Sequence, residues 1–169
     1  MREYLLCVGG SWRAGSAGSA PAVSPSSGET FATVAVAGRP DVDDAVAAAG
    51  AAAPSWAALS PFDRAAACGR VAAAIRDRAD DLARALSQDQ GKPLEAEARD
   101  EVGELAEYFA MAADDAVRLS GGAPPSTSPE RRVLTLRVPL GVVGVISPWN
   151  WPYTMGAELF APRWPRATR

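Results

Sequence analysis

The sequence predicts a helix-rich α/β fold, on two observations. The first is the apolar, valine-rich run from Leu140 to Ile146, which is typical of a strand buried on both faces of a parallel sheet. The second is a stop at Ser147 and Pro148, followed after Pro152 by a segment that can form a helix. Strand, loop and helix make the first half of a βαβ unit. Ligands bind beyond the carboxyl ends of strands in such sheets, so this loop is the first candidate site.

The amino-terminal part of the chain predicts short strands. Tyr4 to Val8 and Ser11 to Arg13 flank the pair Gly9-Gly10 and form a hairpin. Residues 14–20 are small and are expected to be flexible. After a turn at 23–29, a further strand is expected from Phe31 to Ala37.

The middle of the chain predicts helices with recognisable ends. One helix begins at Asp41, because acidic residues in a first turn favour the helix dipole; these acids lack softer ligands and are not expected to bind metal. Ser60 followed by Pro61 caps a helix or helix pair that continues to Gln90, and Gly91 ends it.

A long helix is expected from Leu94 to Leu119, ended by Ser120-Gly121-Gly122. A Pro/Ser linker and a strand from Arg131 to Val138 follow it. One apolar stripe along the helix consists of Leu94, Ala98, Val102, Leu105, Phe109, Ala112, Ala116 and Leu119.

Composition excludes several classes of function. The net charge of −3 provides no basic field for nucleic acid, and the absence of histidine removes imidazole-based catalysis and metal sites. Cys7 and Cys68 lie far apart without metal-ligand spacing and are expected to be reduced packing residues. No stretch is long enough for a membrane span, and the amino terminus has too short an apolar run for a signal peptide. We therefore expect a soluble, cytoplasmic protein that binds neither nucleic acid nor membrane.

The string Pro-Leu-Gly-Val-Val-Gly-Val-Ile-Ser-Pro-Trp-Asn-Trp-Pro, residues 139–152, resembles the signature loop of the NAD(P)-dependent aldehyde dehydrogenases. The resemblance implies that residues 1–162 are the incomplete amino-terminal part of a Rossmann-like cofactor-binding domain. It also implies that 121–138 belong to an arm used for homo-oligomerisation in the complete protein. The sequence Gln-Gly-Lys-Pro-Leu resembles the family's Thr-Gly-Lys-Pro-Leu turn, which makes Lys92 a helix-end cation rather than a catalytic group.

The same resemblance implies roles for the loop residues. The side-chain amide of Asn150, the only asparagine in the chain, would form part of an oxyanion hole. The residues before it would lie at the nicotinamide end of NAD or NADP; they are Ile146, Ser147, Pro148 and Trp149.

The family oxidises a small aldehyde to a carboxylic acid through a thiohemiacetal and a thioester on a cysteine. That cysteine, the catalytic glutamate and the residues that hold the adenosine ribose and the pyrophosphate come later in the family. We therefore expect no turnover from this chain alone. We also expect an exposed apolar edge, because a strand as apolar as 140–146 needs neighbours on both faces.

The last residues, 163–169, depart from the family pattern. A GC-rich coding of Ala-Leu-Ala-Ala-Gly-Asn-Ala that loses its first base translates to Arg-Trp-Pro-Arg-Ala-Thr-Arg, which is this tail. We therefore hypothesise a one-base frameshift that truncates a longer reading frame.

Two other interpretations remain open at this stage. The chain could be a non-catalytic interaction fragment that pairs with full-length homologues, or an unrelated helical domain with a fortuitous loop. The sequence does not distinguish NAD from NADP, and it does not identify the aldehyde.

Overall fold

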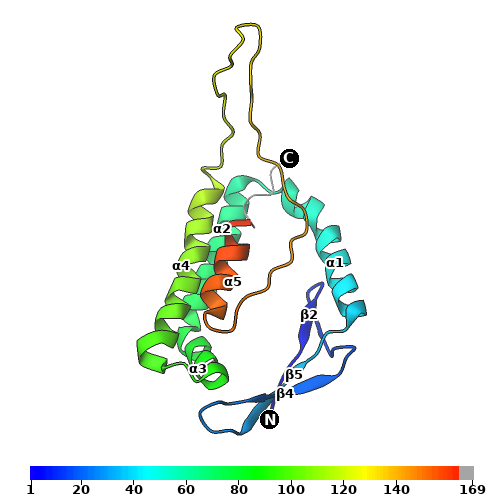
Figure 1. The fold of residues 1–169 in the computed structure, drawn as a ribbon, viewed down its shortest axis with the longest axis vertical. Helices are drawn as coiled ribbons and strands as arrows, with labels where there is room; N and C mark the ends of the chain where they lie inside the picture. The colour runs from blue at the N-terminus through cyan, green and yellow to red at the C-terminus, as the bar shows by residue number, and fades with distance from the viewer. Residues whose placement is uncertain (164–169) are drawn as a thin grey trace.

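The structure, a computed structural model, describes residues 1–163. It has a helical body, two small sheets and a long protruding segment (Figure 1). The strands are β1 (Arg2–Tyr4), β2 (Leu6–Val8), β3 (Ser11–Arg13), β4 (Ser19–Val23) and β5 (Thr30–Ala35). The helices are α1 (Arg39–Ala58), α2 (Pro61–Asp77), α3 (Ala79–Gln90), a π-helical turn (Leu94–Ala98), α4 (Arg99–Ala116), α5 (Pro152–Phe160) and a 3₁₀ turn (Ala161–Arg163). Of the tail predicted to be aberrant, 164–169 lie outside the described residues.

The predicted amino-terminal hairpin is confirmed for Leu6–Val8 and Ser11–Arg13, whereas Tyr4 belongs to β1 and pairs with Val34 of β5. β2 and β3 pair antiparallel, with Leu6 opposite Arg13 and Val8 opposite Ser11. Gly9 and Gly10 join the two strands with φ of 58° and 81°. Positive φ at both central residues matches the twist of the flanking strands, and glycine adopts it at little steric cost.

The second sheet has the order β1-β5-β4. β5 agrees with the predicted strand at Phe31–Ala37, and it pairs parallel with β1 and antiparallel with β4. The prediction that 14–20 are flexible is wrong, because Ser19 and Ala20 belong to β4. The small residues of β4 signal no strand by themselves, and pairing with β5 supplies the structure. Pro21 is tolerated because β4 is an edge strand.

The predicted helix ends are confirmed at two places. At the start of α2, the Ser60 hydroxyl accepts a hydrogen bond from the Asp63 N–H at 3.1 Å. At the end of α3, Gly91 has a left-handed conformation with φ of 72°. α1 is longer than the helix that the sequence predicts from Asp41 to about residue 53, since it begins at Arg39 and continues through Pro54 to Ala58.

The core lies between α2, α4 and α5. Its buried residues come from α2 (Cys68, Ala72), α4 (Leu105, Phe109, Ala112) and the carboxyl-terminal turns (Ala157, Ala161). Phe109 of α4 and Phe160 of α5 have ring centroids 5.5 Å apart at a tilt of 56°. Burial of six residues of the predicted stripe, from Ala98 to Ala116, confirms that apolar face. The single helix predicted from Leu94 to Leu119 is instead a π-helical turn followed by α4, which ends at Ala116. The many alanines let the helices approach closely.

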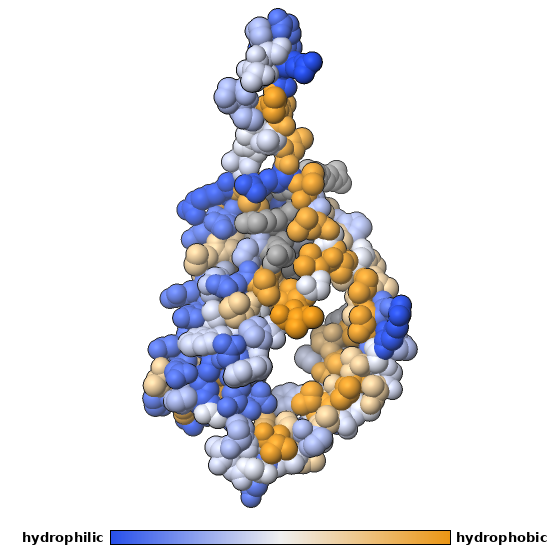
Figure 2. Space-filling model, viewed as in Figure 1, coloured by the Kyte–Doolittle hydropathy of each residue, from blue (hydrophilic) through white to orange (hydrophobic). Residues whose placement is uncertain are grey.

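The strands predicted at Arg131–Val138 and Leu140–Ile146 are not formed. Between α4 and α5 the described chain contains only an isolated bridge, Gly122 to Thr135. A strand needs a hydrogen-bonded neighbour, and neither small sheet extends to this segment. The expected exposed strand edge is therefore absent from the described residues, although the apolar side chains are exposed: Leu140 is 82% exposed and Ile146 is 93% exposed. Figure 2 shows hydrophobic side chains along one side of the protruding segment and down into the body.

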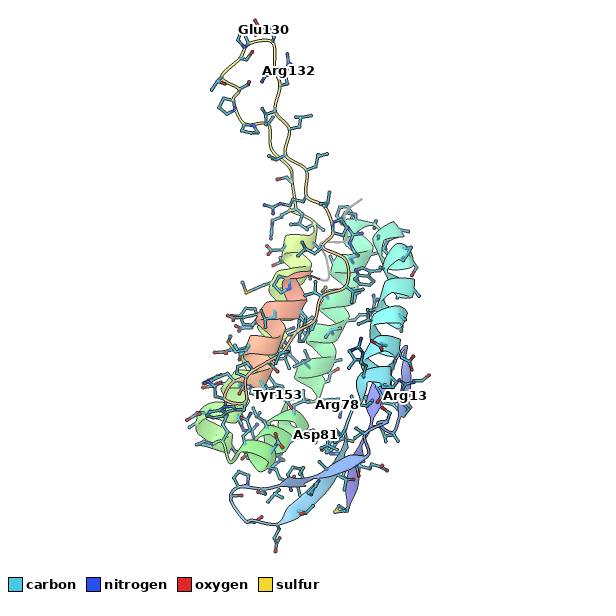
Figure 3. The ribbon with its side chains drawn as sticks, turned by 45° about the vertical axis from the view of Figure 1, so that its right-hand side comes forward. Arg13, Arg78, Asp81, Glu130, Arg132 and Tyr153 are labelled. Atoms are coloured by element: carbon cyan, nitrogen blue, oxygen red, sulfur yellow. The ribbon has the colours of Figure 1, made fainter. Side chains whose placement is uncertain are left out.

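Asp41 joins the amino-terminal strands to α1. Its carboxylate accepts hydrogen bonds from the Ser16 N–H and hydroxyl at 2.8 and 2.6 Å, from the Gly38 N–H at 2.9 Å, and from Arg13 at 3.0 Å. Figure 3 shows Arg13 beside the start of α1. These hydrogen bonds, above all those from Ser16, lower the pKa of Asp41 from 3.8 to about 2.

We expect Asp41→Asn to reduce the free energy of unfolding at neutral pH. The pKa of Asp41 is depressed in the folded state, so its contribution is fully present above about pH 4. That contribution is lost as the pH falls towards about 2, where the folded-state carboxylate takes up its proton. Urea denaturation at several pH values measures the difference. Asp43→Asn is the matched control, because Asp43 is exposed. A difference that stays constant down to pH 2 would contradict the assignment.

Candidate active-site loop

The candidate site residues lie in one loop that leads into α5. Ile146, Ser147, Pro148, Trp149 and Asn150 are all exposed, and Trp149 is 85% exposed. The loop enters α5 near Tyr153, which Figure 3 labels at the base of that helix. The structure thus brings these residues together as a contiguous exposed group.

A buried ion pair lies beneath the loop. The Lys92 ammonium donates to the Glu101 carboxylate, and the side chains are 6% and 0% exposed. The same ammonium donates to the backbone carbonyl of Asn150 at 2.7 Å. It also lies 4.0 Å from the centroid of the Trp151 ring, within the range of a cation–π interaction. Lys92 therefore contacts both the loop and α4.

The other oxygen of Glu101 holds the first turn of α5. It accepts the N–H of Tyr153 at 2.8 Å and, at 3.4 Å, that of Thr154. These N–H groups have no acceptor within the helix, so a carboxylate here satisfies them and favours the helix dipole. Glu104 adds a hydrogen bond from the Thr154 hydroxyl at 2.7 Å. α4 thus fixes the carboxyl-terminal side of the loop.

The amino-terminal side of the loop is held by α3. The Gln90 side-chain amide donates to the Trp149 carbonyl. Together with Lys92, this leaves the Trp149–Asn150 backbone attached to the body while both side chains remain exposed. The arrangement can present a carboxamide to a ligand from a fixed backbone.

Sequence reasoning missed the pairing of Lys92 with Glu101. A signal was present, since Glu101 falls between Ala98 and Leu105 of the apolar stripe and is expected to be buried. A buried carboxylate needs a partner, and Lys92 is the only lysine in the chain. A π-helical turn lies between the two residues and changes the register of the helix. Ordinary α-helical spacing therefore does not predict that their side chains meet.

The tyrosines near the loop do not provide a base. Burial, followed by the charge of Glu101, raises the pKa of Tyr153. A hydrogen bond to Glu158 raises the pKa of Tyr108. Both phenols therefore stay protonated at neutral pH, where they can donate or accept hydrogen bonds but cannot act as bases.

Neither cysteine has the surroundings of a nucleophile. Cys68 is fully buried between α2 and α4, and burial raises the pKa of its thiol. Cys7 lies on β2 and is exposed. Within residues 1–163, no group of three acidic or cysteine side chains could hold a metal ion. No helix in the same range is long and apolar enough to cross a membrane.

The described residues do not form a complete dinucleotide site. Ile146 and Trp149 leave apolar surface open to a planar ring. A pyrophosphate favours a helix N-terminus, but at α5 the carboxylate of Glu101 already accepts the first N–H groups. The loop therefore offers exposed apolar side chains, and the start of α5 offers no free N–H groups to cradle phosphates.

Comparison with known proteins identifies the class. Residues 12–163 match the aldehyde dehydrogenase family. The chain is 36% identical over 132 residues to glutarate-semialdehyde dehydrogenase of Pseudomonas putida, covering 78% of this chain and 27% of the relative. It is 36% identical over 156 residues to the mitochondrial succinate-semialdehyde dehydrogenase of Oryza sativa, covering 92% of this chain and 29% of the relative.

Solved structures agree with this result. A 3,6-anhydro-L-galactose dehydrogenase in complex with NAP superposes with a TM-score of 0.89 at 30% identity. The match covers 99% of this chain and 35% of that structure. The chain belongs to the aldehyde dehydrogenase family, and it has the fold of an amino-terminal part of these Rossmann-like enzymes. An unrelated helical domain is thereby excluded. The chain spans less than a third of the length of these two curated relatives.

We expect one solvent-accessible thiol in the native chain. A disulfide reagent such as dithionitrobenzoate should label Cys7 rapidly, while Cys68 should react only after unfolding, because it is buried with a raised pKa. Counting released thionitrobenzoate before and after denaturant measures this. A Cys7→Ser variant should show no fast phase, and rapid native labelling of Cys68 would contradict its packing role.

Proposed function

We propose that residues 1–162 are the amino-terminal part of the cofactor-binding domain of an NAD(P)⁺-dependent aldehyde dehydrogenase. We further propose that Asn150 donates its carboxamide N–H to the oxyanion of the reacting aldehyde. The observation that carries the proposal is the loop itself. Its backbone is held from below by Gln90 and Lys92, while the Asn150 side chain is exposed.

A fixed donor suits this chemistry. A carbonyl oxygen gains negative charge as a nucleophile attacks its carbon, and a donor already in place stabilises the charge without reorganisation. Removing one such donor typically costs about 3–4 kcal/mol of transition-state stabilisation. A carboxamide can donate but carries no charge of its own, so it favours the oxyanion without pairing with a substrate carboxylate.

Ile146, Ser147, Pro148 and Trp149 are proposed to line the nicotinamide end of NAD or NADP. The dinucleotide supplies the hydride acceptor when bound. The exposed Ile146 and Trp149 side chains provide apolar contact for its ring and exclude water from that side. The phosphate and ribose contacts are assigned to parts of the family fold that match no residue of this chain.

The substrate is proposed to be a small aldehyde. Relatives in the comparison are named for glutarate and succinate semialdehydes, so these are the first substrates to test. The described residues contain no nucleophilic cysteine in a reactive environment. We therefore expect the chain alone to produce no NADH or NADPH.

A chimera tests the proposal directly. Residues 1–160 replace the aligned segment of the Pseudomonas putida glutarate-semialdehyde dehydrogenase, and NAD(P)H formation is followed at 340 nm. We expect the chimera to oxidise the semialdehyde, and we expect Asn150→Ala to lower kcat about 100- to 1000-fold, through loss of the oxyanion donor.

The matched control is Gln88→Ala, which removes an exposed carboxamide distant in sequence from the loop and should leave kcat unchanged. Retention of the parent kcat in the Asn150→Ala chimera would show that Asn150 is not an oxyanion donor. An inactive but folded parent chimera would argue against the competence of this segment.

The exposed apolar segment favours a second candidate function. Leu134, Leu136, Val138 and Leu140 are all exposed along the protruding segment, and Glu130 and Arg132 lie near its far end (Figure 3). Monomeric proteins rarely leave such a surface uncovered. We propose that 121–138 are an oligomerisation arm. Through it, the chain could pair with full-length homologues as a non-catalytic partner, in the cytoplasm, with no part for nucleic acid or membrane.

Co-expression tests the pairing. We expect the tagged chain to co-purify with a full-length homologue and to lose that partner when Leu136→Glu and Val138→Glu are introduced, because charge opposes burial of the segment. Phe62→Glu, at an exposed apolar residue on α2, is the matched control. Equal recovery of the homologue with both variants would contradict the arm assignment.

A further inference from the structure

The buried side chains of Lys92 and Glu101 contact the backbone of the loop, not its exposed side chains. We infer that this buried pair positions Asn150, fixing the backbone at and immediately after the residue whose side chain would act on substrate. The inference rests on the proposed role of Asn150. Lys92 and Glu101 are positioning residues here, since neither is proposed to touch substrate.

The buried pair divides its contacts between Asn150 and the start of α5. Lys92 donates to the carbonyl of Asn150 itself, at 2.7 Å. Glu101 accepts hydrogen bonds from the N–H groups of Tyr153 and Thr154, the third and fourth residues after Asn150. The two side chains are joined to each other, so the loop and the start of α5 are held as one unit.

The Lys92 ammonium contacts three groups around the loop. It donates to two oxygens, on Glu101 and Asn150, and faces the Trp151 ring at 4.0 Å. An ammonium has three N–H donors and no acceptor, so two hydrogen bonds and one contact with the aromatic ring use all three donors. Lys92 therefore restrains both Asn150 and the residue after it.

Both side chains of the Lys92–Glu101 pair are buried. An ion pair with side chains 6% and 0% exposed carries a desolvation cost that apolar residues of similar size avoid. Stability alone therefore does not account for the pair. Its specific property is that it satisfies three backbone groups around the loop, which leucine or methionine could not do.

The experiment uses the whole chain and two isotope labels that each report one residue. Asn150 is the only asparagine and Lys92 the only lysine, so ¹⁵N-asparagine and ¹³C-lysine give unambiguous signals. In the unmodified chain we expect a backbone order parameter near 0.85 for Asn150 and upfield-shifted Lys92 ε-protons, because of the Trp151 ring. An order parameter below about 0.6, or ε-protons at the free-lysine position, would overturn the inference.

Three variants separate positioning from folding. Lys92→Met should lower the order parameter of Asn150 below about 0.6. The double variant Lys92→Met/Glu101→Leu should keep the melting temperature, because an apolar pair replaces the buried charges, and should still leave Asn150 mobile. Lys92→Arg, which preserves a cationic donor, should restore order. If the double variant retains the order of Asn150, the pair is only structural and the inference fails.

Arg99→Met is the matched control, since it removes an ion-paired cation at the start of α4 that does not contact the loop. It should leave the Asn150 signal unchanged. All these readouts are made without substrate or cofactor. An ordered Asn150 combined with full activity in the Asn150→Ala chimera would therefore overturn the proposed function and not this inference.

Discussion

The arrangement of the candidate site depends on one buried ion pair. Lys92 lies just beyond α3, Glu101 lies in α4, and the loop into α5 closes over both. Breaking such a pair by removing one partner costs about 3–5 kcal/mol, since the other charge is left buried and unpaired. The three segments are therefore coupled. Displacing the loop would remove the Tyr153 and Thr154 N–H donors from the Glu101 carboxylate and the Asn150 carbonyl from Lys92.

Much of the helical body could be predicted from the sequence, because its signals are local. Ser60 before Pro61 caps α2, Gly91 adopts the left-handed conformation that ends α3, and the apolar period of α4 places Phe109 inside. Each of these features is decided within a few residues of chain. The hairpin at Gly9-Gly10 belongs to the same group, since two glycines with positive φ are sufficient to define its turn.

The failures concern contacts that are distant in sequence. β4 forms because β5 is available beside it, and its own residues gave no indication of a strand. The run from Leu140 to Ile146 has a strong strand signal but no neighbouring strand among the described residues, so it stays irregular and exposed. The sequence identified the loop containing Asn150 through its resemblance to a family. It did not identify Lys92 and Glu101, whose connection depends on how α3, α4 and α5 pack.

The Asn150 loop and the apolar run before it differ in how they are held by the rest of the chain. The Asn150 loop is attached by Gln90, Lys92 and Glu101, all from the helical body, so its anchoring requires nothing beyond the described residues. The apolar run before it is mostly exposed, and none of its residues is buried against the described part of the chain. An apolar strand gains its stability from burial on both faces, and that burial has to come from a further sheet. The chain therefore anchors Asn150 to the helical body beside an apolar segment that is irregular and exposed. Anchoring of the site and completion of the sheet are separable properties of this fold.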